Sequence, residues 1–333
     1  MSDLILQGSV LAHANVNIAL IKYWGKAPER GAWEQNLPAV PSLSLTLEGL
    51  GSETRVRFAP DASDDQLILD AEQVAGAALD RVRPILDRVR DLAEIASPFH
   101  VESTNQVPTA AGLASSASGA AALAAGAARC AGLELSLEEL SAIARLGSGS
   151  ASRSIFPGWA AWEGPHAHSV AGVDHWDVAL VVALIDSGTK AISSREAMNR
   201  TARTSPLYSG WVASARSEFD AGLAAVRARD MDALSEAMER STLRMHACAM
   251  GADPPVLYWK PASLAAIEVV RGLRERGVAC GWTMDAGPNV KVLCARESAE
   301  QLRDALQTVA GVSEVLICAP GDGVRVSVES ETP

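Results

Sequence analysis

The chain has 333 residues, of which 48% are hydrophobic and 21% are charged. This composition can bury a large core in one big domain or two smaller ones, and it excludes an intrinsically disordered chain. The formal net charge of −11 argues against general nucleic-acid binding, although a local basic pocket could still hold a small anionic substrate.

The sequence gives no sign of a membrane segment or an export signal. The N-terminal stretch MSDLILQGSV lacks a basic region followed by a long apolar run. The most apolar window, VALVVALI at 178–185, is too short to span a bilayer. We therefore expect a cytoplasmic protein that binds no membrane.

The cysteines favour a reducing compartment, since their number is odd and none form a CxxC pair. We expect them to be reduced, buried and packed as small apolar side chains. They are Cys130, Cys248, Cys280, Cys294 and Cys318.

The first third of the chain is predicted to be rich in strands. Alternation and β-branched content predict strands over 43–47 and 53–59, and a further strand is predicted over 99–104. Between them, apolar residues three and four positions apart predict a helix over 79–93. Pro84 interrupts that pattern, which indicates a kink or a second helix start.

The rest of the chain mixes helices and strands in an irregular order. Helices are predicted over 115–131 and 137–146, the second with Ser136 as N-cap and Glu139 at capping-box spacing. The remaining elements are strands over 158–163 and 177–185, helices over 205–228, 230–249 and 262–277, strands over 280–286 and 290–294, a helix over 297–309, and strands over 313–318 and 323–328. This order favours an α+β fold over a doubly wound sheet.

A neutral loop of small and hydroxyl residues, PTAAGLASSASG at 108–119, comes just before the Ala-rich helix. Unpaired N–H groups at a helix start attract phosphate. Gly112 would let the backbone approach a ligand, and Ser115 and Ser116 would add hydroxyl donors. A loop packed tightly beneath the helix explains the composition equally well. The loop is neither a Walker A motif nor a dinucleotide fingerprint, because the chain contains no GxxxxGK[ST] and no GxGxxG.

Several motifs indicate a family. PTAAGLASSA at 108–117 resembles the P-x-x-x-G-L-x-S-S-A loop that holds the ATP phosphates in the GHMP kinase superfamily, which includes galactokinase, homoserine kinase and mevalonate kinase. Elsewhere the chain is similar to the diphosphomevalonate decarboxylase (mevalonate diphosphate decarboxylase) family, with a resemblance that extends from about residue 10 to 328. The motifs that carry it are, in order, NIALIKYWGK (17–26), GSGSASRSIFPGW (147–159), SSREAM (193–198), TSPLY (204–208), MHACAMGADPP (245–255) and MDAGPNVKVL (284–293).

The resemblance implies both a fold and an activity. The fold is GHMP-kinase-like, with an N-terminal half (1–187) like domain 2 of ribosomal protein S5 and a C-terminal ferredoxin-like half (188–333). The activity is ATP-dependent decarboxylation of (R)-5-diphosphomevalonate, through phosphorylation of its 3-hydroxyl, to isopentenyl diphosphate, CO2, ADP and phosphate. The resemblance also implies ATP and Mg²⁺ as cofactors, and a homodimer.

The resemblance assigns catalytic roles as well. Asp285 would orient the 3-hydroxyl and take its proton, with Lys22 beside it near the transferring phosphate. Arg153, helped by Asn17, would grip the C1 carboxylate through two parallel hydrogen bonds. Ser116 would reach the ATP phosphates or the 3-oxygen. Without the resemblance, plainer roles explain these residue types: a turn-stabilising aspartate, a lysine whose amine reaches water, and an arginine at a helix C-terminus.

Further residues are assigned to the diphosphate and to ATP by the same resemblance. The 5-diphosphate would contact Tyr23, Lys26, Ser148, Ser150, Ser194, Arg195 and Met198. ATP would contact Asn105, Pro108, Ala110, Ala111, Gly112, Leu113, Ala114, Ser115 and Ser116. Taken singly, each serine assigned to the diphosphate is better explained as a cap or turn hydroxyl. No metal ligand is assigned, because residues 117–131 lack the acid that many superfamily kinases carry on the helix after the loop.

Two departures from the family pattern and three alternative functions stay open. Ala197 stands where a glycine is common, and the segment APERGAWEQNLPAV (27–40) is longer than the usual connection. The alternatives are a mevalonate monophosphate decarboxylase, a mevalonate 3-kinase that stops after phosphorylation, and a catalytically silent binding protein on the same fold. Lys26 and Arg195 suit a diphosphate or a monophosphate, whereas release of CO2 separates a decarboxylase from a kinase.

Overall fold

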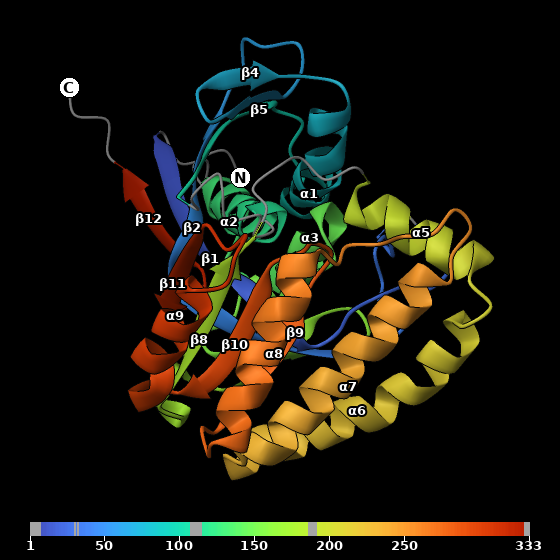
Figure 1. The fold of residues 1–333 in the computed structure, drawn as a ribbon. Helices are drawn as coiled ribbons and strands as arrows, with labels where there is room; N and C mark the ends of the chain where they lie inside the picture. Colours follow the sequence, from blue (N-terminus) through green and yellow to red (C-terminus); the bar gives the residue numbers. More distant parts are fainter. Residues whose placement is uncertain (1–7, 30, 32, 107–114, 186–191, 330–333) are drawn as a thin grey trace.

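The computed structural model describes residues 8–29, 31, 33–106, 115–185 and 192–329, without the side chain of Ser115 (Figure 1). Helices and strands are mixed in irregular order around two separate sheets, so the predicted α+β class is confirmed. None of the helices in this described part of the chain combines the length and hydropathy that a membrane span would need.

The first sheet is built around two long antiparallel strands, β1 (Ser9–Ile21) and β2 (Ser42–Phe58). Strand β2 replaces the two strands predicted over 43–47 and 53–59, because β1 pairs with both halves of it. On its other edge, the first half pairs with β6 and the second half with β5. The strand order is β12-β1-β2-β5-β3-β4, and β6 also pairs with β7. The other strands are β3 (Gln66–Leu69), β4 (Glu72–Val74), β5 (Phe99–Asn105), β6 (Trp159–Trp162), β7 (Ala167–Ala171) and β12 (Arg325–Glu329).

The second sheet has the order β11-β8-β10-β9, and every neighbouring pair is antiparallel. Its strands are β8 (Val178–Leu184), β9 (Cys280–Met284), β10 (Val290–Ala295) and β11 (Glu314–Cys318). The predicted domain boundary at 187/188 lies outside the described residues, and the division stays a prediction. The sheets do not follow it strictly, since β8 belongs to the second sheet and β12, near the C-terminus, to the first.

The helices agree with the predicted ones except at three places. They are α1 (Ala77–Ala93), α2 (Ser115–Cys130), α3 (Leu137–Gly147), α4 (Ala151–Ser154), α5 (Ser194–Thr204), α6 (Tyr208–Ala228), α7 (Met231–Met250), α8 (Pro261–Glu275) and α9 (Ala299–Gln307). Helix α1 continues through Pro84, so a second helix start there is wrong. The short helix α4 and the polar helix α5 were not predicted, since neither has a broad apolar stripe. The capping box of α3 is confirmed, with Glu139 N–H donating to Ser136 Oγ at 3.2 Å and Ser136 N–H donating to Glu139 Oε2 at 2.8 Å.

Apolar clusters join these layers. Helices α1, α2 and α3 pack on one face of the first sheet. The opposite face packs against α6, α7 and the inner face of the second sheet, whose outer face is covered by α8 and α9 (Figure 1). Small residues let α2 lie close to its sheet, because a Cβ at Gly126 would come within 3.0 Å of Val56 Cγ2. The five cysteines are free and buried in these layers, as predicted.

Candidate active site

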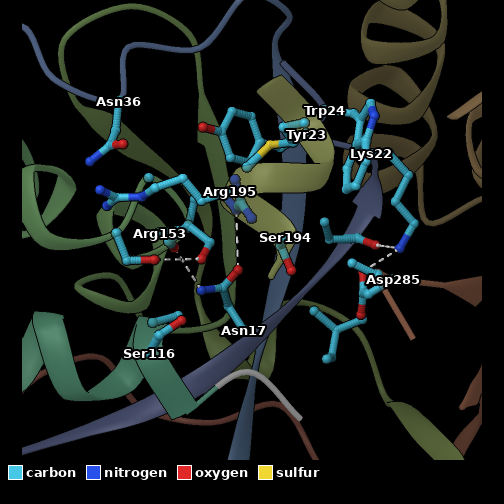
Figure 2. Close-up of a pocket in the computed structure, with 18 of the residues that line it drawn as sticks. Asn17, Lys22, Tyr23, Trp24, Asn36, Ser116, Arg153, Ser194, Arg195 and Asp285 are labelled. Carbon is cyan, nitrogen blue, oxygen red and sulfur yellow. Dashed lines mark hydrogen bonds and ion pairs between the residues drawn. The ribbon is translucent and has the colours of Figure 1, made fainter. Parts of the chain in front are cut away.

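A cavity of about 220 Å³ lies where segments from both halves of the chain meet (Figure 2). Its walls come from the end of β1 and the residues after it, the start of α2, the α3–α4 connection, the start of α5 and the turn between β9 and β10. The fold brings together here every predicted catalytic and substrate-binding residue, namely Asn17, Lys22, Tyr23, Lys26, Ser116, Ser148, Ser150, Arg153, Ser194, Arg195, Met198 and Asp285.

Asp285 is the one carboxylate among the described residues that line the cavity, and two lysines hold it. Its Oδ1 accepts a hydrogen bond from Lys22 Nζ at 2.6 Å, and its Oδ2 lies 3.0 Å from Lys291 Nζ. The aspartate directly follows β9, in a turn that the Gly287 N–H closes by donating to the Asp285 carbonyl at 2.8 Å. The Asp285 side chain is 35% exposed, against 1% for Lys22 and 4% for Lys291. The carboxylate therefore keeps an open face toward the cavity.

The two lysines control the charge of Asp285. Burial alone would raise the pKa of this carboxyl, but Lys22 and Lys291 outweigh burial and hold the pKa well below its ordinary value. Burial also lowers the pKa of Lys22 to about 8, aided by repulsion from Lys291 and Arg153 and opposed by the attraction of Asp285. Asp285, Lys22 and Lys291 together carry a formal net charge of one positive unit, which suits an anionic substrate.

Arg153 of α4 is a buried cation on the other side of the cavity (Figure 2). It is 2% exposed, its Nε donates to Asn17 Oδ1 at 3.2 Å, and its Nη1 donates to Ser42 Oγ at 2.8 Å. Its guanidinium carbon lies 5.6 Å from the centroid of the Trp162 ring. Burial lowers the pKa of Arg153 to about 10, and no acid in the described part of the chain forms an ion pair with it. A guanidinium in this state has free donors for the carboxylate of a ligand.

Three more cations, Lys26, Arg81 and Arg195, line the same cavity. Burial lowers the pKa of Lys26 to about 8, with repulsion from Arg195 adding to the effect. Burial and repulsion from Arg81 likewise lower the pKa of Arg195, and Glu29 offsets these effects only in part. The buried Tyr23 hydroxyl has no hydrogen-bond partner among the described residues. A bound phosphate would offset the repulsion among these cations, and its oxygens would accept a hydrogen bond from the Tyr23 hydroxyl.

Serine hydroxyls lie along the remaining wall. The Ser148 and Ser150 hydroxyl oxygens are 3.3 Å apart, and the Ser150 carbonyl accepts a hydrogen bond from Asn17 Nδ2 at 2.9 Å. Ser116 and Ser194 lie in the first turns of α2 and α5. Ala197, where the family pattern favours glycine, is fully buried in an apolar cluster with Trp24 and Trp211 and is not among the residues that line the cavity.

The predicted nucleotide contacts are described only in part. Pro108, Ala110, Ala111, Gly112, Leu113 and Ala114 lie outside the described residues, as does the side chain of Ser115. Asn105 does not line the cavity. Its backbone N–H and its Nδ2 donate to Asp70 at 2.8 and 3.1 Å, and its Oδ1 accepts from the Ser52 hydroxyl at 3.1 Å. These bonds occupy the polar groups of Asn105 within the protein, so ATP binding by Asn105 stays a prediction.

Some cavity residues were missed in the sequence, among them Lys291, Asn36 and Arg81. Lys291 is a single cation in the apolar strand VKVLC, and the argument that an interior lysine needs an anion, applied to Lys22, would have found it. Asn36 comes from the long 27–40 segment, and its Nδ2 donates to the Arg145 and Leu146 carbonyls, both at 2.9 Å. These bonds fix the segment against the end of α3.

The described residues do not build a metal cage. No group of three or more His, Cys, Asp or Glu side chains in this part of the chain is arranged to hold a metal ion. The lining carboxylate, Asp285, already binds two ammonium groups. A divalent ion in this cavity would have to take most of its ligands from phosphate oxygens and water, as Mg²⁺ commonly does.

The two-sheet fold and the cation-rich cavity, which the start of α2 helps to line, define an enzyme of the GHMP kinase type. Residues 14–171 match the family model "Diphosphomevalonate decarboxylase-like N-terminal domain", and residues 180–322 match "Mevalonate 5-diphosphate decarboxylase C-terminal domain". The chain belongs to the diphosphomevalonate decarboxylase family.

Individual relatives and solved structures agree with this family. The chain is 30% identical to diphosphomevalonate decarboxylase of Candida albicans, over 96% of this chain and 98% of that protein. It is 29% identical to phosphomevalonate decarboxylase of Haloferax volcanii, over 86% and 88%. The structure of mevalonate diphosphate decarboxylase from Staphylococcus aureus superposes with a TM-score of 0.89 at 38% identity, covering 96% of this chain and 98% of that one. A structure described as "MDDEF in complex with MVAPP, AMPPCP and Magnesium" superposes with a TM-score of 0.88 at 41% identity, covering 97% and 99%.

Proposed function

We propose that the protein catalyses the ATP-dependent decarboxylation of (R)-5-diphosphomevalonate to isopentenyl diphosphate, CO2, ADP and phosphate. Family membership supports this activity, as does the similar protein that was solved with MVAPP, AMPPCP and magnesium. The observation that carries the proposal is the buried Arg153, which has no acidic partner in the part of the chain that the structure describes and lies in the same cavity as the Asp285–Lys22 pair. A substrate with both a carboxylate and a hydroxyl would satisfy both groups at once.

The cavity's cations would bind the two anionic ends of the substrate separately. The C1 carboxylate would accept hydrogen bonds from Arg153, which Asn17 and Ser42 hold in place. The 5-diphosphate would lie among Lys26, Arg195 and the Tyr23 hydroxyl, with Ser148, Ser150, Ser194 and the Met198 backbone contributing further contacts. This arrangement would leave the 3-hydroxyl near Asp285.

Asp285 would orient the 3-hydroxyl toward the phosphoryl donor rather than act as a strong base. Its pKa is held low by two ammonium groups, so it would take the proton only once the new O–P bond makes the hydroxyl acidic. A loose phosphoryl-transfer transition state needs positioning and charge stabilisation more than a strong base. Lys22 and the Ser116 hydroxyl would donate to the oxygens of the transferring group.

Loss of the phosphate would then drive decarboxylation. As the C3–O bond breaks, phosphate leaves with the bonding pair and C3 becomes electron-poor. The C1–C2 bonding pair moves to form the C2–C3 double bond, and C1 departs as CO2. The cations around Lys22 would stabilise the leaving phosphate, while Arg153 would hold the carboxylate without having to donate a proton.

The phosphoryl donor would be ATP, and Mg²⁺ would accompany its phosphate groups. The start of α2, where Ser116 faces the cavity, is suited to bind phosphate. Bound Mg²⁺ would supply charge neutralisation at the phosphate oxygens. The described side chains offer no carboxylate cluster for the ion, which agrees with an ion carried mainly by the nucleotide.

The test is incubation of the protein with ATP, Mg²⁺ and a panel of mevalonate phosphates, with CO2 and ADP measured together. We expect one CO2 per ADP with the 5-diphosphate, and less product with the 5-monophosphate. ADP without CO2 would indicate a 3-kinase, faster turnover of the monophosphate would indicate the monophosphate decarboxylase, and neither product with any substrate would contradict an enzymatic role. We also propose that the protein is a cytoplasmic homodimer, which cell fractionation and light scattering can test.

A further inference from the structure

Lys291 occupies a position where the fold alone favours an apolar residue. It lies in the middle of the second sheet, paired with Thr283 of β9 and Val182 of β8. Its neighbours Val290 and Val292 belong to the core beneath α8 and α9, so Lys291 points to the opposite, inward face. Leu293 follows on that face and is fully buried. An ammonium group that is 4% exposed on such a face is costly unless it is paired.

The pairing of Lys291 is specific. Its Nζ lies 3.0 Å from Asp285 Oδ2, whereas Lys22 donates to the other oxygen, Oδ1, at 2.6 Å. Lys22 also donates to the Ala19 carbonyl at 2.8 Å, so it is anchored independently of Asp285. The carboxylate thus has one ammonium group for each oxygen. Both lysines line the cavity.

We propose that Lys291 is a positioning residue for the phosphoryl-transfer step, and that it holds Oδ2 of Asp285 so that Lys22 can leave Oδ1 and donate to the transferring phosphoryl group. If Lys291 were absent, the same movement of Lys22 would leave neither oxygen of the Asp285 carboxylate bonded to an ammonium group. This inference rests on the proposed function, since it assigns the role of Lys291 through Asp285.

The charged and titratable groups around Asp285 allow a test by pH. Among the described elements they are Lys22 at the end of β1, Lys291 on β10, Arg153 on α4 and His246 on α7. His246 contributes little charge near neutral pH, because burial lowers its pKa to about 3. Removal of Lys291 leaves Lys22 as the one ammonium group bonded to the carboxylate. The pKa of Asp285 should therefore rise, because a close opposite charge is lost.

The experiment compares Lys291→Met and Lys291→Arg with two controls. Thr283→Val changes the same hairpin without changing charge, and Lys260→Met removes an exposed lysine elsewhere. Steady-state CO2 release is measured over a pH range, and the ionisation of Asp285 is followed in the ligand-free protein by carbon NMR of labelled carboxyl groups. Circular dichroism verifies folding of each variant.

We expect Lys291→Met to lower kcat at least about tenfold with little change in KM for either substrate, because the lost contact acts on the reacting state. In Lys291→Met the alkaline limb of the kcat–pH profile should move to higher pH, because the repulsion that Lys291 exerts on the Lys22 ammonium is lost. The Asp285 carboxyl should titrate at higher pH, and Lys291→Arg should restore part of the rate. An unchanged Asp285 titration, or equal losses in Thr283→Val, would overturn the proposal. If the wild type releases no CO2 while the NMR titration shifts as expected, the proposed function fails and the hold of Lys291 on Asp285 stands. If the wild type is active and the titration does not move, the failure belongs to Lys291 alone.

Discussion

Replacement of Arg153 by methionine should separate folding from substrate binding. The guanidinium is 2% exposed and forms no ion pair with an acid among the described residues, and burial lowers its pKa to about 10, which corresponds to roughly 3 kcal/mol of unfavourable charge burial. Methionine removes that cost but leaves the Asn17 and Ser42 acceptors unsatisfied, at about 1–3 kcal/mol each. These terms partly offset each other, so the free energy of unfolding of the ligand-free protein should change by no more than about 3 kcal/mol.

Binding should respond far more strongly. Two charge-assisted hydrogen bonds to a carboxylate are worth about 1.5–3 kcal/mol each, which predicts a rise in Kd of about 10² to 10⁴. Calorimetric titration with 5-diphosphomevalonate measures the Kd, and urea denaturation of the free protein measures stability. Arg216→Met is the matched control, because Arg216 is 61% exposed and lies away from the cavity. A Kd within about threefold of the wild type would refute the role given to Arg153.

Three further predictions address the reaction and the fold. Asp285→Asn should remain folded and bind substrate while turnover falls by about 10² to 10⁴, as seen by CO2 release with calorimetric binding in parallel; near-normal turnover would contradict its role. Because burial lowers the pKa of both Lys22 and Lys26 to about 8, kcat should fall and KM should rise as the pH increases above this value and the ammonium groups lose their protons. In Lys26→Met, KM should no longer rise at alkaline pH, whereas kcat should still fall. If KM still rises at alkaline pH in this variant, Lys26 is not the group that controls it. Ser136→Ala should lower the free energy of unfolding by about 1 kcal/mol in urea denaturation without changing turnover, since it removes only the capping box of α3.

Local sequence patterns were sufficient for most of the elements and for part of the site. The capping box at Ser136, the apolar stripe of α1 and the alternation in β2 involve residues a few positions apart, and each was predicted from such spacing. The family motifs also identified Lys22 and Arg153, which the structure places in one cavity. The polar helix α5 was missed, because few of its residues are apolar and its stability comes from contacts with the rest of the fold.

The sequence by itself determined the α+β class, the buried apolar positions and the types of charged residue available for catalysis. Only the tertiary structure decided that Lys22 and Asp285, 263 positions apart, form an ion pair, and that Lys291 completes it. It also decided that β8 joins the second sheet and β12 the first. The physical reason is that periodicity reports which face of an element is buried, whereas the partner of that face depends on strand pairing between distant segments.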